Sequence, residues 1–345
     1  MKKQITLLAG ILMAVLFSFS SCQEMMVGPE VDNSNENNFR QMWEKFDSHY
    51  GLFIVKNIDW NKVYASHMPM AKAAKTDAEL FSVLSSAVHF LDDKHINIYT
   101  NSPALTDYNS GENGHIPAQE GFDFKVIREN YLIEYHEESE DFGYGKLTSE
   151  IGYIRIESFQ GEFSFYEKNI EKAITSLAST KGIVFDIRDH KGGSDLVSKH
   201  IASRFASSKK LFMTSRKRNG PAHDQFEAAI NWFIEPAGKS QYTKPVILLT
   251  TSTTISAGET FTFAMRENAN VTHMGTTTAG AFSDVIPHQL PNGWLVTIGV
   301  GDYRGSDGKS YEGIGITPKI ISENKKSDVL NGVDKTLELA RENLE

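Results

Sequence analysis

The feature that most constrains the fold is an alternation of short apolar runs with amphipathic segments in the second half of the chain. The apolar runs are residues 152–156, 182–187 and 246–250, and the amphipathic segments that follow them are residues 165–177, 195–205 and 256–267. Runs of strand length alternating with helical patterns indicate βαβ units, in which helices pack on a sheet. The sequence therefore predicts an α/β core over residues 151–345, with turns at 291–293 and 306–308 and a last helix at 328–343.

The segment before this core has a different pattern. Apolar residues recur at helical spacing from Phe39 to Leu91, and Asp59 and Thr76 stand where helix N-caps are expected. We expect an N-terminal helical domain over residues 39–98 and a connecting β region over residues 99–150. Two short runs in that connecting region, 122–126 and 131–135, are predicted strands.

The start of the chain has the order of a secretory signal. Lys2 and Lys3 precede an apolar run over residues 5–17, which is too short to span a bilayer comfortably, and small residues lead to Cys22. Residues 19–22 resemble the lipobox of bacterial lipoproteins, which implies export to the cell envelope and a membrane anchor through acylated Cys22. An ordinary cleaved signal and a free thiol are the alternatives. We expect residues 1–22 to be the signal peptide and 23–38 a flexible tether.

Charge and motifs exclude several classes of protein. The formal net charge is -9, with no long block of Lys or Arg, so nucleic acid is not an expected partner. The chain has one cysteine, and it lacks an HExxH motif, a P-loop and a dinucleotide fingerprint. We therefore predict no metal, no organic cofactor and no intrachain disulfide.

Two strand-to-helix turns carry residues suited to acyl transfer. In the first, Gly192 and Gly193 can present backbone N–H groups to an oxyanion, although a plain turn with Ser194 as N-cap explains the same residues. In the second, Ser256 precedes a helix, where the dipole favours developing negative charge. A capping box between Ser256 and Glu259 is the alternative there.

Two further residues are candidates only in combination. His95 ends the helical domain and can serve as a general base if the fold brings it to a serine, but a lone histidine at a helix end is usually structural. Glu312 lies in a glycine-spaced turn and can orient an imidazole, although a solvated turn residue is the simpler interpretation.

The order of the four segments resembles the C-terminal processing (tail-specific) serine peptidases. The shared segments are Asp-Lys-His, Asp-Ile-Arg-x-x-x-Gly-Gly, Thr-Ser-x-x-Thr-x-Ser-Ala-Gly-Glu and Glu-Gly-x-Gly-Ile-x-Pro. Within this family the chain resembles the histidine branch, which includes the tricorn core protease and retinoid-binding-protein-like modules. The resemblance implies a ClpP/crotonase-like core and the following site: Ser256 as nucleophile, His95 as general base, Glu312 as orienting acid, N–H groups of Ala257 and of Gly192 or Gly193 as oxyanion hole, and Lys94 and Glu259 in support.

The chain departs from the family pattern at a few positions. Residues 280–282 read Gly-Ala-Phe where the lysine branch has Gly-Lys-Gly, so a Ser-Lys dyad is not expected. His190 stands where the family commonly has Asn, and Lys319 replaces the usual Asp. About fifty residues separate His95 from the core, which is too few for a PDZ domain of ordinary size.

The function implied is hydrolysis of a peptide or protein substrate through an acyl-enzyme on Ser256. Two alternatives stay open from sequence alone. One is a non-catalytic envelope lipoprotein that binds peptides or other ligands on the same fold, and the other is an esterase with the same triad.

Overall fold

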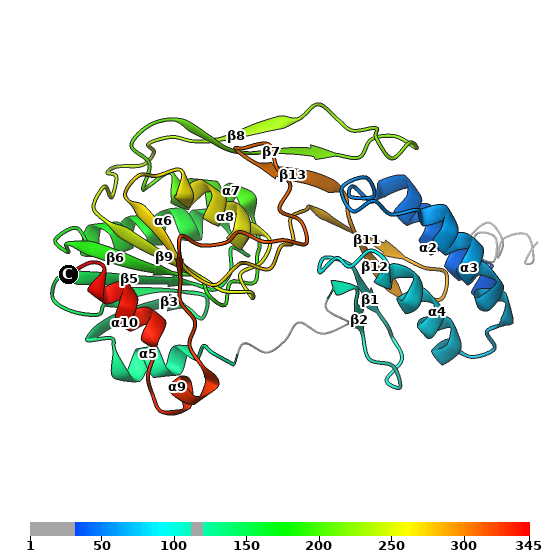
Figure 1. Ribbon diagram of the computed structural model, residues 1–345, viewed down its shortest axis with the longest axis horizontal. Helices are drawn as coiled ribbons and strands as arrows, with labels where there is room; N and C mark the ends of the chain where they lie inside the picture. The colour runs from blue at the N-terminus through cyan, green and yellow to red at the C-terminus, as the bar shows by residue number, and fades with distance from the viewer. Residues whose placement is uncertain (1–31, 112–119) are drawn as a thin grey trace, which may run out of the picture.

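A computed structural model describes residues 32–111 and 120–345. The predicted signal peptide, most of the predicted tether and Cys22 lie outside the described residues. Figure 1 shows an α/β part at one end, a helical part at the other and a β-sheet that runs along one side of both.

The α/β part is built on a mixed seven-stranded sheet. Its strand order is β14-β10-β9-β6-β5-β4-β3. The strands are β3 (Glu134–Ser139), β4 (Phe142–Lys146), β5 (Ile151–Ile156), β6 (Gly182–Asp186), β9 (Val246–Thr250), β10 (Val271–Gly275) and β14 (Ile320–Ile321). β5, β6, β9, β10 and β14 are parallel, whereas β3 and β4 form an antiparallel edge. All residues of β5, β6 and β9 are buried, as expected for strands covered on both faces.

Helices cover both faces of this sheet (Figure 1). On one face lie α6 (Phe163–Ser176), α7 (Asp195–Ala202) and α8 (Ala257–Arg266), and on the other α5 (Phe124–Asn130) and α10 (Lys335–Glu342), with α9 (Lys326–Leu330) nearby. Each face has its own apolar core: Phe185 and Phe261 belong to the first, and Ile127 and Leu337 to the second. The predicted α/β core with an N-terminal helical region is confirmed.

The helical part contains α2 (Asn35–His49), α3 (Trp60–Ala73) and α4 (Asp77–His89). The prediction of a tether to residue 38 is wrong at its end, because Ser34 caps α2 by accepting the N–H of Asn37, and residues 35–38 belong to that helix. The predicted N-caps are confirmed, because Asp59 accepts from Lys62 N–H and Thr76 from Glu79 N–H. These helices pack on a second sheet, β11-β12-β1-β2, formed by β11 (Val285–Gln289), β12 (Leu295–Gly299), β1 (Asn97–Tyr99) and β2 (Tyr108–Asn109). Thus residues 285–299, which lie within the predicted core segment, complete the helical part.

The connecting region differs in part from the prediction. Residues 124–130 form helix α5 rather than a strand over 122–126, because the Asp123 side chain accepts the N–H of Lys125 and caps a helix. β3 and β4 extend the large sheet, so the α/β part begins before residue 151. The last predicted helix is two helices, α9 and α10, separated by Gly332 with φ +75°.

A third sheet connects the two parts. Its order is β13-β7-β8, with β13 (Gly301–Gly305), β7 (Lys210–Lys217) and β8 (Ile230–Ile234). Figure 1 shows it above both parts. Arg218, after β7, donates to the carbonyls of Asp47 and Tyr50 at 3.0 Å each, so the sheet is fastened to helix α2 and the turn after it.

In the described ranges, no helix combines the length and apolar character needed to cross a membrane.

Candidate active site

The candidate nucleophile lies in a strained turn between β9 and α8. Ser256 has φ 58° and ψ -122°, a backbone conformation that is costly for a residue with a Cβ. Its N–H donates to Glu259 Oε2 at 3.2 Å, and its side chain is partly exposed. Strain of this kind at a strand-to-helix turn is how nucleophilic serines are presented at the end of a sheet.

The glycine turn after β6 lies directly against this serine. A Cβ placed on Gly192 would be 2.9 Å from Ser256 Cβ and 3.3 Å from its Oγ, so only glycine allows the approach. Gly192 and Gly193 have φ of +92° and +127°, which glycine adopts at low cost. The two predicted turns therefore meet in the fold.

The hydrogen bonds of these two turns show which backbone N–H groups are available to an oxyanion. Gly192 N–H donates to Nδ1 of His190 at 3.0 Å and is already paired. In the described part of the chain, the N–H groups of Gly193 and Ala257 have no acceptor. Of the two glycines that the sequence left open, Gly193 thus has the free donor.

Glu259 fastens a neighbouring segment to the nucleophile turn. Its fully buried carboxylate accepts Thr278 Oγ1 at 2.6 Å, Gly280 N–H at 2.7 Å and Ala281 N–H at 2.8 Å, in addition to Ser256 N–H. Burial raises the pKa of Glu259 to about 7, against the effect of these donors. The predicted capping contact is present, and the same carboxylate also holds segment 278–284, which contains the acceptor of the Lys94 side chain described below.

His95 lies just after α4, where its backbone is fixed on both sides. Its N–H donates to Asp93 Oδ1 at 2.8 Å, and its carbonyl accepts Thr297 Oγ1 at 2.7 Å. Ring atom Nδ1 is buried and has no hydrogen-bond partner among the residues that the structure describes. Burial lowers the pKa of His95, while the carboxylates of Asp93 and Asp284 oppose that shift. The imidazole is therefore neutral near pH 7, as a general base must be.

The turns that carry His95 and Ser256 are both bonded to segment 278–284. Lys94 Nζ donates to the carbonyl of Ala279 at 2.9 Å, and Ala279 N–H donates to the carbonyl of Thr254 at 3.0 Å. Among the described residues, no hydrogen bond links the His95 ring to Ser256 or to Glu312. Such contacts are often long without substrate, so this geometry does not exclude His95 as the base.

Glu312 is buried beside the same segment. Its Oε2 accepts Phe282 N–H at 2.7 Å, whereas Oε1 has no hydrogen bond within residues 32–111 and 120–345 and lies 3.8 Å from Lys56 Nζ. Burial raises the pKa of Glu312 well above its usual range, Asp93 adds to this, and Lys56 opposes it. The alternative of a solvated turn residue is wrong, because Glu312 is buried. Its hydrogen bond is to segment 278–284 and not to His95.

His190 is the residue that sequence reasoning noticed but did not use. It is fully buried and its Nδ1 accepts Gly192 N–H. Its Nε2 is buried and has no partner in the part of the chain that the structure describes. It cannot take a proton from Ser256, because neither ring nitrogen is open to the serine. No pattern in the sequence shows which N–H its ring would meet, so only the departure from Asn marked it.

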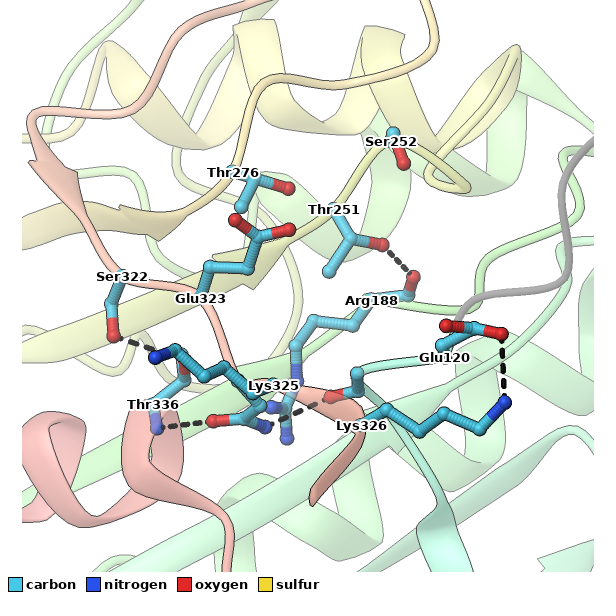
Figure 2. A pocket seen from close by; sticks show the side chains of 12 residues that line it. Glu120, Arg188, Thr251, Ser252, Thr276, Ser322, Glu323, Lys325, Lys326 and Thr336 are labelled. Atoms are coloured by element: carbon cyan, nitrogen blue, oxygen red, sulfur yellow. Dashed lines mark hydrogen bonds and ion pairs between the residues drawn. The ribbon is translucent and has the colours of Figure 1, made fainter. Parts of the chain in front are cut away.

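A separate cavity of about 460 Å³ lies at the carboxyl ends of the parallel strands. Figure 2 shows Thr251 and Ser252 on its wall with Arg188, and Glu120 paired with Lys326 at 2.9 Å. None of the predicted site residues lines it. No group of three or more metal-ligating side chains occurs in residues 32–111 and 120–345.

Comparisons with known proteins agree with this geometry. Residues 150–322 match peptidase family S41, and residues 32–88 match the tricorn protease C1 domain. A Parabacteroides merdae crystal structure, described as a candidate peptidase, superposes with a TM-score of 0.80 at 27% identity, over 91% of this chain and 97% of that one.

Two curated relatives match part of the chain. The carboxy-terminal-processing protease of Bartonella bacilliformis is 27% identical over 198 residues, which are 56% of this chain and 43% of that protein. The carboxy-terminal processing protease of Bacillus subtilis is 27% identical over 175 residues, or 50% of this chain and 35% of that protein. The matches thus span less than half of the length of either relative. Because the family match covers half of the 345 residues and includes both the glycine turn and the Ser256 turn, this chain belongs to peptidase family S41.

Proposed function

We propose that this protein is a serine peptidase that cleaves a peptide or protein substrate through an acyl-enzyme on Ser256. The observation that carries the proposal is the strained Ser256 at the start of α8, with the two unpaired N–H groups of Gly193 and Ala257 in adjoining turns. Preorganised donors of this kind supply about 10²–10³-fold each in acyl transfer.

The proposed steps are those of acyl transfer by a serine with a histidine base. His95 removes the proton of Ser256 as its Oγ attacks the carbonyl carbon, and the oxyanion binds the N–H groups of Gly193 and Ala257. His95 then returns the proton to the leaving amine, and water hydrolyses the ester with the same base. No cofactor enters this scheme.

Glu312 has an orienting role in this proposal that acts through segment 278–284. By accepting Phe282 N–H it holds the residues before Asp284, one of the two carboxylates that favour the charged form of His95. Lys94, bonded to Ala279, supports the same segment from the side of His95.

Hydrolysis of casein and of a peptide library by the purified protein tests the activity. Ser256→Ala should abolish turnover, while Ser252→Ala, an exposed serine in the same β9–α8 connection, should leave it unchanged. Faster turnover of simple esters than of peptides would favour an esterase. Equal turnover by wild type and Ser256→Ala, or no cleavage at all, would reject the peptidase and favour a ligand-binding protein.

Export and lipid attachment at Cys22 are a second part of the proposal, supported by the order of charged, apolar and small residues before that cysteine. Expression in a bacterium with labelled palmitate should label wild type and place it in the membrane fraction. Cys22→Ala should remove both effects, and a labelled Cys22→Ala protein would contradict the assignment.

A further inference from the structure

We infer that His190 is a positioning residue that shapes the oxyanion hole: its neutral ring accepts Gly192 N–H through Nδ1 and thereby leaves Gly193 N–H directed at the substrate. This inference rests on the proposed role of Ser256.

Three polar groups of His190 bind both turns of the site. Its carbonyl accepts the N–H of Ile255, the residue before Ser256, at 3.1 Å, and its own N–H donates to Ile187 at 3.2 Å. The ring accepts Gly192 N–H at 3.0 Å. One residue therefore connects the end of β6, the glycine turn and the nucleophile turn.

Packing fixes the orientation of the ring. The Phe159 ring lies 4.3 Å from the imidazole, centroid to centroid. A Cβ on Gly258 would be only 2.7 Å from Nδ1, so the first turn of α8 also packs closely against the ring. Phe159 also bonds the glycine turn, because its N–H donates to the Gly192 carbonyl at 2.8 Å and its carbonyl accepts Ser194 N–H at 3.1 Å. The imidazole cannot turn away without moving one of these elements.

The hydrogen bond from Gly192 N–H defines the protonation state of the His190 ring. Because Nδ1 accepts a backbone N–H, the ring proton is on Nε2, which is buried and has no partner in the described part of the chain. Burial lowers the pKa of His190 to about 3, with no charged group contributing. His190 thus keeps one neutral tautomer at pH 5 and above.

Removal of the His190 ring, which accepts Gly192 N–H, should disturb the geometry of the oxyanion hole and leave substrate binding nearly unchanged. A buried N–H without a partner is unfavourable, so Gly192 would rotate to find another acceptor and would carry Gly193 with it. A displacement of about 1 Å at a reacting group lowers rates by about 10²-fold.

His190→Asn and His190→Leu form a matched pair for the test. Both side chains branch at Cγ, but only Asn places an acceptor where Nδ1 lies. We expect His190→Asn to keep kcat within about 10-fold and His190→Leu to lose about 10²–10³-fold in kcat, with KM nearly unchanged in both. Equal kcat in the two variants, both folded by circular dichroism, would overturn the inference.

Nitrogen-15 NMR of the histidine side chains gives a measure that does not depend on activity. In wild type, His190 should show an unprotonated Nδ1 and a protonated Nε2 down to pH 5. A protonated Nδ1, or titration near pH 6.5, would overturn the inference. If wild type cleaves nothing while the tautomer is as expected, the proposed function fails and the hydrogen bond of His190 stands.

Discussion

Replacement of Glu259 by Ala should destabilise the protein by about 3–5 kcal/mol. The fully buried carboxylate accepts two backbone N–H groups of segment 278–284, one hydroxyl, and Ser256 N–H at the longer distance of 3.2 Å. Each unpaired buried donor costs about 1–3 kcal/mol. The Thr278 hydroxyl can rotate to another acceptor, and water can enter the space left by the Glu259 side chain. The low end of the summed cost of the unpaired donors is therefore appropriate.

Urea unfolding followed by tryptophan fluorescence measures this change. The control is Glu342→Ala, an exposed residue of α10 that should change the free energy of unfolding by less than about 0.5 kcal/mol. A loss below about 1 kcal/mol for Glu259→Ala would refute the view that this carboxylate holds segment 278–284.

Titration of stability gives a second check on Glu259. Its pKa is about 7 in the folded protein against 4.5 in the unfolded chain, so between these values only the folded state holds the proton. The free energy of unfolding should therefore fall as pH rises through this window, by about 1.4 kcal/mol per pH unit from this group. Glu259→Gln should lack that slope, and an unchanged slope would contradict the assignment.

Three further outcomes follow from the geometry. His95→Ala should lower kcat/KM by about 10²–10⁴-fold without loss of stability, and the acid limb of the wild-type profile should lie below pH 6.5, because burial lowers the pKa of this base. Gly193→Ala should abolish measurable peptidase turnover, since a Cβ there would lie 2.4 Å from the carbonyl carbon of Phe159; full activity would contradict the assigned donor. His190 and His273 have pKa values of about 3 when folded, so between pH 6.5 and 5.0 only the unfolded chain binds protons at these residues. Acidification over this range should cost about 1.6 kcal/mol per histidine in urea unfolding.

The α/β core was predictable because its strands are continuous apolar runs. Val246–Thr250 is an apolar run that is buried at every position, and a helix start signal follows it in the sequence. A buried strand is the structure that such a run favours. β8 could not be predicted in this way, because Ile230–Ile234 is only partly buried and its strand conformation depends on pairing with β7. The contribution of β12 to the helical part was not predicted, because β12 is distant in sequence from β1 and is joined to it by the antiparallel pairs Ile98–Val296 and Tyr99–Leu295.

The site was predictable only in part. The Ser-x-x-Glu spacing indicated that Ser256 and Glu259 would interact, but it did not show that Glu259 also binds a segment twenty residues later. The choice between Gly192 and Gly193 depends on a single hydrogen bond to His190, and residue order contains no information on the direction of one N–H. Such details arise from backbone conformation at a few residues with positive φ.

The central claim is that Ser256 is an activated nucleophile, and covalent labelling tests it most directly. A fluorophosphonate should modify wild type at Ser256 alone, as mapped by mass spectrometry of peptides, and His95→Ala should slow the labelling by about 10²-fold or more. Absence of labelling in the folded protein, or labelling that persists in Ser256→Ala, would contradict the account.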